Sequence, residues 1–252
     1  MTALTGFSTG QVTERINDNG VDKKLCSLLL EHDTITFSLL KSRIPERLST
    51  TALWRNYIGY WKIKNDSLFL DSVTIPDVNC KEEKYTSVKI DDIYSPKRTD
   101  SGYFADWVSD TLRIVSGNVI NYIHSGWMQV WEHEELVSVE KGIIKGRKSF
   151  DNRTVLKGHS DNEIRQMYEN LDFGEIPGRI IVSLGYSSFD TDGNPETCNI
   201  RVIKSSGDKS VDERVVKVFE EWMLTSYPLP VYYINGHYES GKHLLLQLPV
   251  SK

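Results

Sequence analysis

Residues 179–189 read RIIVSLGYSSF, residues 190–194 read DTDGN and residues 196–205 read ETCNIRVIKS. The two outer runs are rich in β-branched and aromatic residues, which favour strands. The segment between them contains Asp, Gly and Asn, which favour tight turns. The stretch therefore predicts a β-hairpin in the last third of the chain.

Two helix starts flank this hairpin. Ser160 and Glu163 form a capping-box pattern, and Ser210 with Glu213 repeats it. The second of these helices carries an apolar stripe at helical spacing, formed by Val211, Val215, Val218, Phe219 and Trp222. Because such a stripe needs a covering layer, we expect the helix to lie on the sheet. A last strand is predicted from His243 to Val250, which gives the order strand, turn, strand, helix, strand.

This order resembles the C-terminal domain of TonB-type energy transducers, which are bacterial proteins. The matching segments are residues 178–184 (GRIIVSL), 192–193 (DG), 201–207 (RVIKSSG), 211–216 (VDERVV) and 241–250. The resemblance implies an antiparallel sheet with helices on one face, whose edge captures an extended segment of an outer-membrane transporter through main-chain hydrogen bonds. We find no Pro-rich spacer among the eight prolines and no membrane helix, and Ile176-Pro177 stands where the family has Tyr-Pro. The resemblance therefore implies the fold and the mode of binding rather than energy transduction.

The part of the chain before this module resembles no known family, and its pattern is β-rich. Residues 11–18 are predicted to form a short helix that ends at Asn19-Gly20, and residues 34–39 alternate like a strand. Residues 57–63 and 68–75 predict a hairpin around a four-residue loop, and residues 77–84 predict a polar loop.

Two segments of this part follow the same pattern. Residues 102–107 and 126–131 both fit Gly-aromatic-x-x-x-Trp before a strand, which suggests a meander of similar hairpins. Chance agreement between aromatic-rich strands is the alternative. In either case we expect Trp61, Trp107 and Trp131 in a core rather than around a ligand. A polar stretch near residues 151–158 places the domain boundary, so we expect a β-rich domain at 1–156 and an α+β module at 157–252.

Composition limits the classes of function. Hydrophobic residues make up 39% and charged residues 26% of 252 residues, which is typical of a soluble globular protein. A net charge of -5 argues against a nucleic-acid binder. The three Cys residues, at 26, 80 and 198, are far apart, which argues against a disulfide framework or a thiolate zinc site. Without a visible signal peptide or membrane span, a cytoplasmic location is the default expectation.

Motifs for catalysis or metal binding do not withstand inspection. Residues 190–194 invite a calcium interpretation, but an EF-hand loop counted from Ser188 has Asn199 where Glu is needed, so a hairpin turn is preferred. His133 lacks the second His of a zincin signature. We therefore expect no cofactor, no metal and no catalytic residue. Carboxylates at Asp106, Glu132 and Glu134 could still meet in space and serve an enzyme.

Three functions follow from these patterns. The first is a non-catalytic module that binds a protein or peptide partner, with an extended segment docked on a sheet edge. The candidate docking residues are Ser183, Tyr186, Phe189, Leu244, Leu246 and Leu248. The second is an inhibitor or immunity-type protein for one partner. The third is an enzyme or small-molecule binder with a pocket in the Trp-rich domain.

Overall fold

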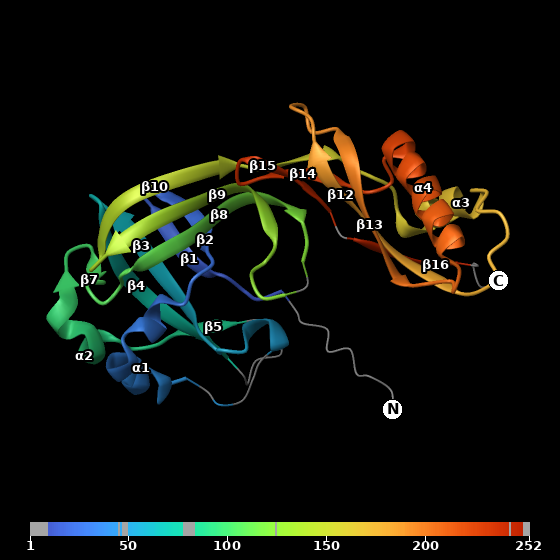
Figure 1. Ribbon diagram of the computed structural model, residues 1–252. Coiled ribbons are helices and arrows are strands. Elements are labelled where there is room, and N and C mark those ends of the chain that lie inside the picture. The colour runs from blue at the N-terminus through green and yellow to red at the C-terminus, as the bar shows by residue number, and fades with distance from the viewer. Residues whose placement is uncertain are drawn as a thin grey trace. The chain divides into compact units, whose positions relative to one another are not determined.

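The computed structural model describes residues 10–44, 46, 50–77, 84–123, 125–241 and 243–248. The chain forms two compact units, Met1–Asp151 and Asn152–Lys252. Within the described residues the fold is α+β and rich in β-structure (Figure 1). It contains a mixed sheet of ten strands, two small antiparallel sheets and four α-helices, and none of those helices is long and apolar enough to cross a membrane.

The first unit contains the ten-stranded sheet and two of the α-helices. Its strands are β1 (Glu14–Asp18), β2 (Val21–Leu25), β3 (Ile58–Lys64), β4 (Ser67–Pro76), β5 (Tyr85–Ser87), β6 (Arg98–Thr99), β7 (Gly102–Phe104), β8 (Asp110–Asn121), β9 (Val130–Glu140) and β10 (Ile143–Asp151). Its helices are α1 (Thr34–Lys41) and α2 (Asp91–Tyr94), with short 3-10 turns η1 (Leu29–His32), η2 (Thr51–Leu53) and η3 (Ser95–Lys97).

The large sheet closes on itself. Its strand order is β10-β9-β8-β2-β1-β3-β4-β7-β6, and β5 also pairs with β4. A further pairing joins β10 to β4, where Leu68 N donates to Gly142 O at 2.8 Å and Ile144 N donates to Asp66 O at 2.9 Å. Strands β4, β3, β1, β2, β8, β9 and β10 thus form a ring, in which β1 and β3 are the parallel pair.

The predicted helix over residues 11–18 is wrong. Residues Glu14–Asp18 form β1, which makes a hairpin with β2. Asn19 and Gly20 both have positive φ, at 49° and 94°, as a two-residue hairpin turn of the mirror-image type requires. Asn-Gly is the strongest short signal for a hairpin turn, but it also occurs at helix ends, which is how the sequence analysis interpreted it.

The predicted strand over residues 34–39 is also wrong, because these residues begin α1. The Asp33 side chain accepts a hydrogen bond from Thr36 N at 3.1 Å, which makes Asp33 the N-cap. The alternation of Thr and apolar residues favours a strand, but the hydrogen bond at the Asp33 cap favours a helix start, and the helix forms.

The predicted hairpin of residues 57–63 and 68–75 is confirmed as β3 and β4. Its turn residues Asn65 and Asp66 have φ of 50° and 55°. Of the predicted loop 77–84, residues 78–83 lie outside the described part of the chain.

The meander is confirmed only for β8, β9 and β10, which follow one another antiparallel. The two segments of the repeated pattern are not equivalent, since residues 102–104 form the short strand β7 beside β4, whereas residues 126–129 precede β9.

The core of the first unit fills the ring. Its members include Ile16, Ile63, Leu112, Ile114 and Val137, each at most 1% exposed. The expectation that the three Trp residues lie in a core is borne out most clearly for Trp61, which is 2% exposed. Trp107 is partly buried against the same core, and Trp131 is 9% exposed on the other face.

The second unit contains two three-stranded sheets and two helices. Its elements are β11 (Arg153–Leu156), α3 (Asp161–Glu169), β12 (Ile180–Phe189), β13 (Pro195–Lys204), α4 (Lys209–Ser226), β14 (Val231–Ile234), β15 (His237–Ser240) and β16 (Leu244–Leu248). The sheets have the orders β13-β12-β16 and β11-β14-β15, all antiparallel. Strand β11 precedes the boundary expected at residue 156, and it belongs to this unit through its pairing with β14.

Several predictions for this unit are confirmed. Ser160 caps α3 in a capping box with Glu163, and residues 190–194 form the turn of the β12–β13 hairpin. The stripe of α4 packs into one core with β12 and β16. The second predicted cap is wrong, because α4 begins two residues earlier, with Asp208 as N-cap. The predicted element order also lacks the β14–β15 hairpin, which lies between α4 and β16.

Candidate functional site

The two strands proposed from the sequence for docking lie in different positions of their sheet. Strand β12 is central, since it pairs with β13 on one side and with β16 on the other. The pairing with β16 covers Ile180–Leu184, so Ser183 lies between two strands, whereas Tyr186 and Phe189 have their register partners on β13. Strand β16 lies at an edge within the described residues.

The candidate residues of β12 are held by their own unit. Tyr186 is 5% exposed and its hydroxyl donates to Met223 O at 3.3 Å. Phe189 packs its ring 6.3 Å from that of Tyr186. Ser183 is opposite Leu245 of β16. Ser183 thus pairs with the edge strand, and Tyr186 and Phe189 pack within their own unit.

The candidate residues of β16 face the core. Leu244, Leu246 and Leu248 are opposite Leu184, Val182 and Ile180 of β12. Leu246 is 5% and Leu248 is 2% exposed, and Leu244 is partly buried. Their role is to fix the strand on the sheet.

Leu245 is the residue that the sequence prediction missed. It is 66% exposed, because its neighbours Leu244 and Leu246 point into the core and successive side chains of a strand alternate between faces. The period of two along Leu244–Leu248 is the signal that could have separated it from the other leucines.

The two edges of this sheet differ in chemistry. Strand β13 carries the exposed charged residues Glu196, Arg201 and Lys204, of the kind that protects an edge from further pairing. Strand β16 reads LLLQL and has no charge. Alternate backbone N–H and C=O groups of an edge strand point away from its one neighbour, so β16 presents an unprotected row of hydrogen-bonding groups.

Four cavities of the Trp-rich unit are open to the surface. Their volumes are about 630, 350, 340 and 340 Å³. In the described parts of the chain no three His, Cys, Asp or Glu residues are grouped in a way that could hold a metal ion. The carboxylates considered for catalysis have separate partners: Asp106 pairs with Lys97, Glu132 with Asn118 and Glu134 with Arg113.

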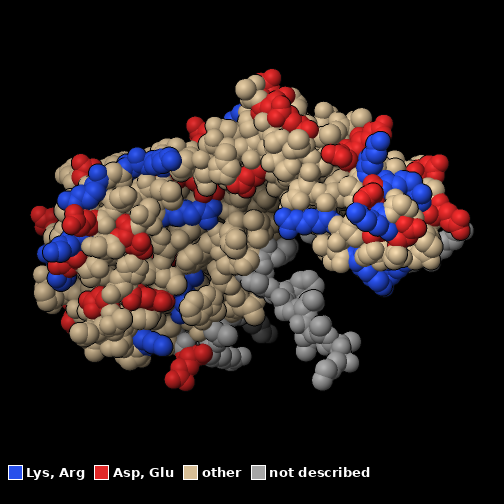
Figure 2. Space-filling model, in the orientation of Figure 1, with Lys and Arg blue, Asp and Glu red and all other residues tan. Residues whose placement is uncertain are grey.

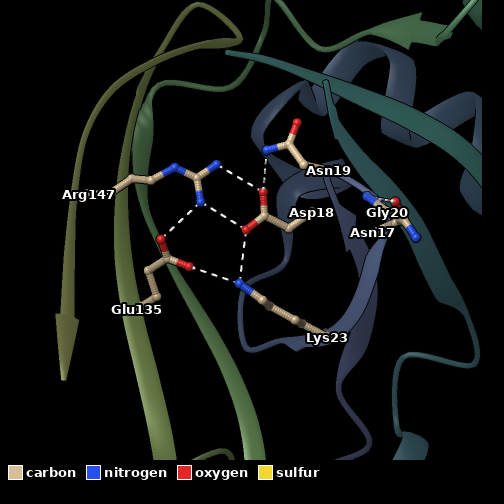
Figure 3. A network of polar contacts seen from close by, with 7 residues as sticks. All are labelled: Asn17, Asp18, Asn19, Gly20, Lys23, Glu135 and Arg147. Carbon is tan, nitrogen blue, oxygen red and sulfur yellow. Dashed lines mark hydrogen bonds and ion pairs between the residues drawn. The ribbon is translucent and has the colours of Figure 1, made fainter. Parts of the chain in front are cut away.

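A four-charge network lies inside the ring (Figure 3). Asp18 accepts from both terminal nitrogens of Arg147, at 2.9 and 3.0 Å, and from Lys23 at 2.9 Å. Glu135 accepts from Arg147 at 2.9 Å and from Lys23 at 3.2 Å. Burial alone would raise the pKa of Asp18, but the bonds from Arg147 and Lys23 outweigh it and hold this pKa below its ordinary value. The network links β1 and β2 to β9 and β10, and its charges satisfy one another.

A second buried pair includes Glu14 and Arg55, whose side chains are 0% and 1% exposed. Arg55 Nε lies 3.9 Å from Glu14 Oε1, and Trp61 Nε1 donates to Glu14 Oε2 at 2.5 Å. Burial raises the pKa of Glu14 to about 7, even though Arg55 and Trp61 lower it. Among the described residues, the guanidinium nitrogens of Arg55 have no hydrogen-bond acceptor. Such a pair makes the stability of the first unit sensitive to pH.

Comparison of the chain with models of protein families, with curated proteins and with solved structures gives no match.

Proposed function

We propose that the protein is a non-catalytic binding module, and that strand β16 of its second unit captures an extended segment of a protein partner. The observation that carries the proposal is an uncharged edge strand, Leu244–Leu248, with Leu245 exposed at its centre. Main-chain hydrogen bonds to the edge would supply affinity, and contacts with alternate side chains would supply selectivity.

The chemistry of the edge defines the occupant. Leu245 and the apolar strand favour a peptide with apolar side chains at alternate positions and no requirement for charge. The opposite edge, β13, is a poorer site for such a segment. An added apolar strand there would remove water from the charged side chains of Arg201 and Lys204, which costs free energy. The resemblance to TonB C-terminal domains agrees with this mode of binding and stays a prediction.

The test begins with random twelve-residue peptides displayed on phage and selected against the full chain. Peptides that bind are then measured against Leu245→Lys and against Ile203→Lys. Ile203 is 60% exposed on β13 and Leu245 is 66% exposed on β16, so the two substitutions add the same charge at matched exposure. We expect a loss of affinity of about tenfold or more for Leu245→Lys alone, because edge lysines block strand pairing.

A scan of N-methylated peptides separates strand pairing from other contacts. Each methyl group removes one backbone donor, and an added strand directs alternate donors at the edge. Affinity should therefore fall at every second peptide position. A uniform or absent effect would contradict strand addition, and chain dimers lost in Leu245→Lys would identify a second copy of the chain as the occupant.

A further inference from the structure

Two surface cavities of the first unit meet at a pair of basic residues. Cavities of about 630 and 340 Å³ are both lined by Arg15 and Lys24. Arg15 of β1 is directly opposite Lys24 of β2 in the antiparallel register. Because the neighbouring Ile16 is 1% exposed in the core, Arg15 points to the other face of the sheet, where it is exposed.

The larger cavity is basic, although the chain is acidic. Its lining includes the basic residues Arg15, Lys23, Lys24 and Lys62 and the acidic residues Asp22 and Asp71. The net charge of the chain is -5, and acidic and basic side chains are interspersed over the face shown in Figure 2. A local excess of positive charge in such a protein indicates an anionic ligand.

The other two lysines of the lining are already in ion pairs. Lys62 pairs with Asp71 at 2.9 Å, and Lys23 pairs with Asp18 at 2.9 Å. Asp22 accepts a hydrogen bond from Asn17 Nδ2 at 2.6 Å, and because this amide is neutral the Asp22 carboxylate keeps its negative charge. Among the described residues, neither Arg15 nor Lys24 forms an ion pair.

Like charges directly opposite each other on neighbouring strands destabilise a sheet. Burial and the charge of Arg15 lower the pKa of Lys24 below its ordinary value. A bound anion would remove this repulsion, since it would lie within reach of both cations. With the Asp22 carboxylate of the lining, the two cations leave a net charge of +1. Arg15 and Lys24 can still both donate charge-assisted hydrogen bonds to one phosphate monoester, which carries a charge of about -1.5 to -2 at neutral pH.

Aromatic groups border the same pair. Lys24 Nζ lies 3.7 Å from the centre of the Trp131 ring, and Tyr60 is opposite Arg15 on β3. Tyr60 and Trp131 line the larger and the smaller cavity respectively. They offer apolar surface to the organic part of a ligand whose anionic end lies between the cations.

We propose that this groove binds a small phosphate monoester, with the phosphate between Arg15 and Lys24 and the organic group along Tyr60. The site belongs to the first unit and is independent of the strand docking proposed for the second.

Titration calorimetry of the full chain with phenyl phosphate tests the site. We expect saturable binding that weakens about tenfold or more in Arg15→Gln and in Lys24→Gln, because each loses a charge-assisted contact. Arg15→Lys should retain most of the affinity. Lys145→Gln is the matched control, since Lys145 lies on β10, pairs with Glu140 at 3.5 Å and does not line the groove.

Two further ligands test the two halves of the proposal. Benzenesulfonate has the same ring but one negative charge, so it should bind more weakly than phenyl phosphate. Inorganic phosphate lacks the ring and should also bind more weakly. Absence of saturable binding, an equal loss in Lys145→Gln, or full affinity in both groove variants would overturn the site, and equal affinity for inorganic phosphate would overturn the assignment of an ester.

Discussion

The two units of the protein treat the edges of their sheets differently. In the first unit, hydrogen bonds between β10 and β4 join seven strands into a ring. In the second, the sheet of β13, β12 and β16 ends within the described residues at a strand with no charge. An uncovered apolar edge is a template for another strand, whereas a joined edge is not. This difference is why we propose strand capture for the second unit.

The interiors differ as well. The buried charged residues of the described chain are Glu14, Asp18, Arg55 and Glu134, all in the first unit. The core of the second unit is built from apolar and aromatic side chains. Burial of the Glu14 carboxyl is expected to make the stability of the first unit depend on pH, while the second unit depends on packing.

The largest effect is expected for Asp18→Ala, which removes the acceptor of Arg147 and Lys23 inside the ring. Three charge-assisted hydrogen bonds are lost, and Glu135 alone remains as acceptor for Arg147 and Lys23, so we expect the free energy of unfolding to fall by about 3 kcal/mol. Urea denaturation measures it. Asp71→Ala breaks the exposed pair with Lys62 and should cost less than about 1 kcal/mol. Equal losses in the two variants would contradict a structural role for the network.

Opening the ring comes next. Gly142 has φ of 77°, and a Cβ there would lie 2.8 Å from Ala105 O, beside the bonds that join β10 to β4. Gly142→Ala should lower the free energy of unfolding by about 2 kcal/mol or more through strain and displacement. A Cβ at Gly146, on β10 itself, would meet open space, so Gly146→Ala should change the free energy of unfolding by less than about 0.5 kcal/mol. A stable Gly142→Ala protein would show that the closure is dispensable.

The pH dependence of stability tests the Glu14 pair. Its folded pKa is raised to about 7 from 4.5, so the native state holds the proton more tightly than the unfolded state. This contribution is full below the unfolded pKa and is lost as pH rises through the folded pKa. Between about pH 5 and about pH 7 the free energy of unfolding should fall by roughly 2 kcal/mol. Glu14→Gln should remove this slope, and an unchanged slope would assign it to other groups.

The smallest effect on stability is expected at the open edge. Leu245→Lys adds charge to a side chain that is 66% exposed, so the free energy of unfolding should change by less than about 0.5 kcal/mol. Differential scanning calorimetry of the full chain measures it. A large loss would mean that Leu245 supports the fold, and its effect on peptide binding would then need another explanation.

The sequence predicted most of the second unit because its signals are local. The turn at residues 190–194, the capping box at Ser160 and the stripe of α4 each lie within a few residues. The errors also came from local signals, since Asn19-Gly20 suits both a helix end and a hairpin. At residues 34–39 the alternating pattern predicted a strand, whereas the N-cap at Asp33 starts the helix α1.

The ring and the candidate sites could not be predicted in the same way. The pairing of β4 with β10, and the meeting of Asp18 with Arg147, join residues far apart in the chain. The register that brings Arg15 opposite Lys24 depends on a hairpin that the prediction did not contain. The position of β16 beside Ile180–Leu184 of β12 follows from strand order, which no periodicity encodes.

Hydrogen exchange of the full chain, with and without a selected peptide, tests the docking claim most directly. If the peptide adds a strand to β16, the outward amides among Leu244–Leu248 should exchange more slowly in the complex, while β13 and the ring strands keep their rates. Unchanged exchange along β16, with protection in another segment, would contradict the claim that this edge is the binding site.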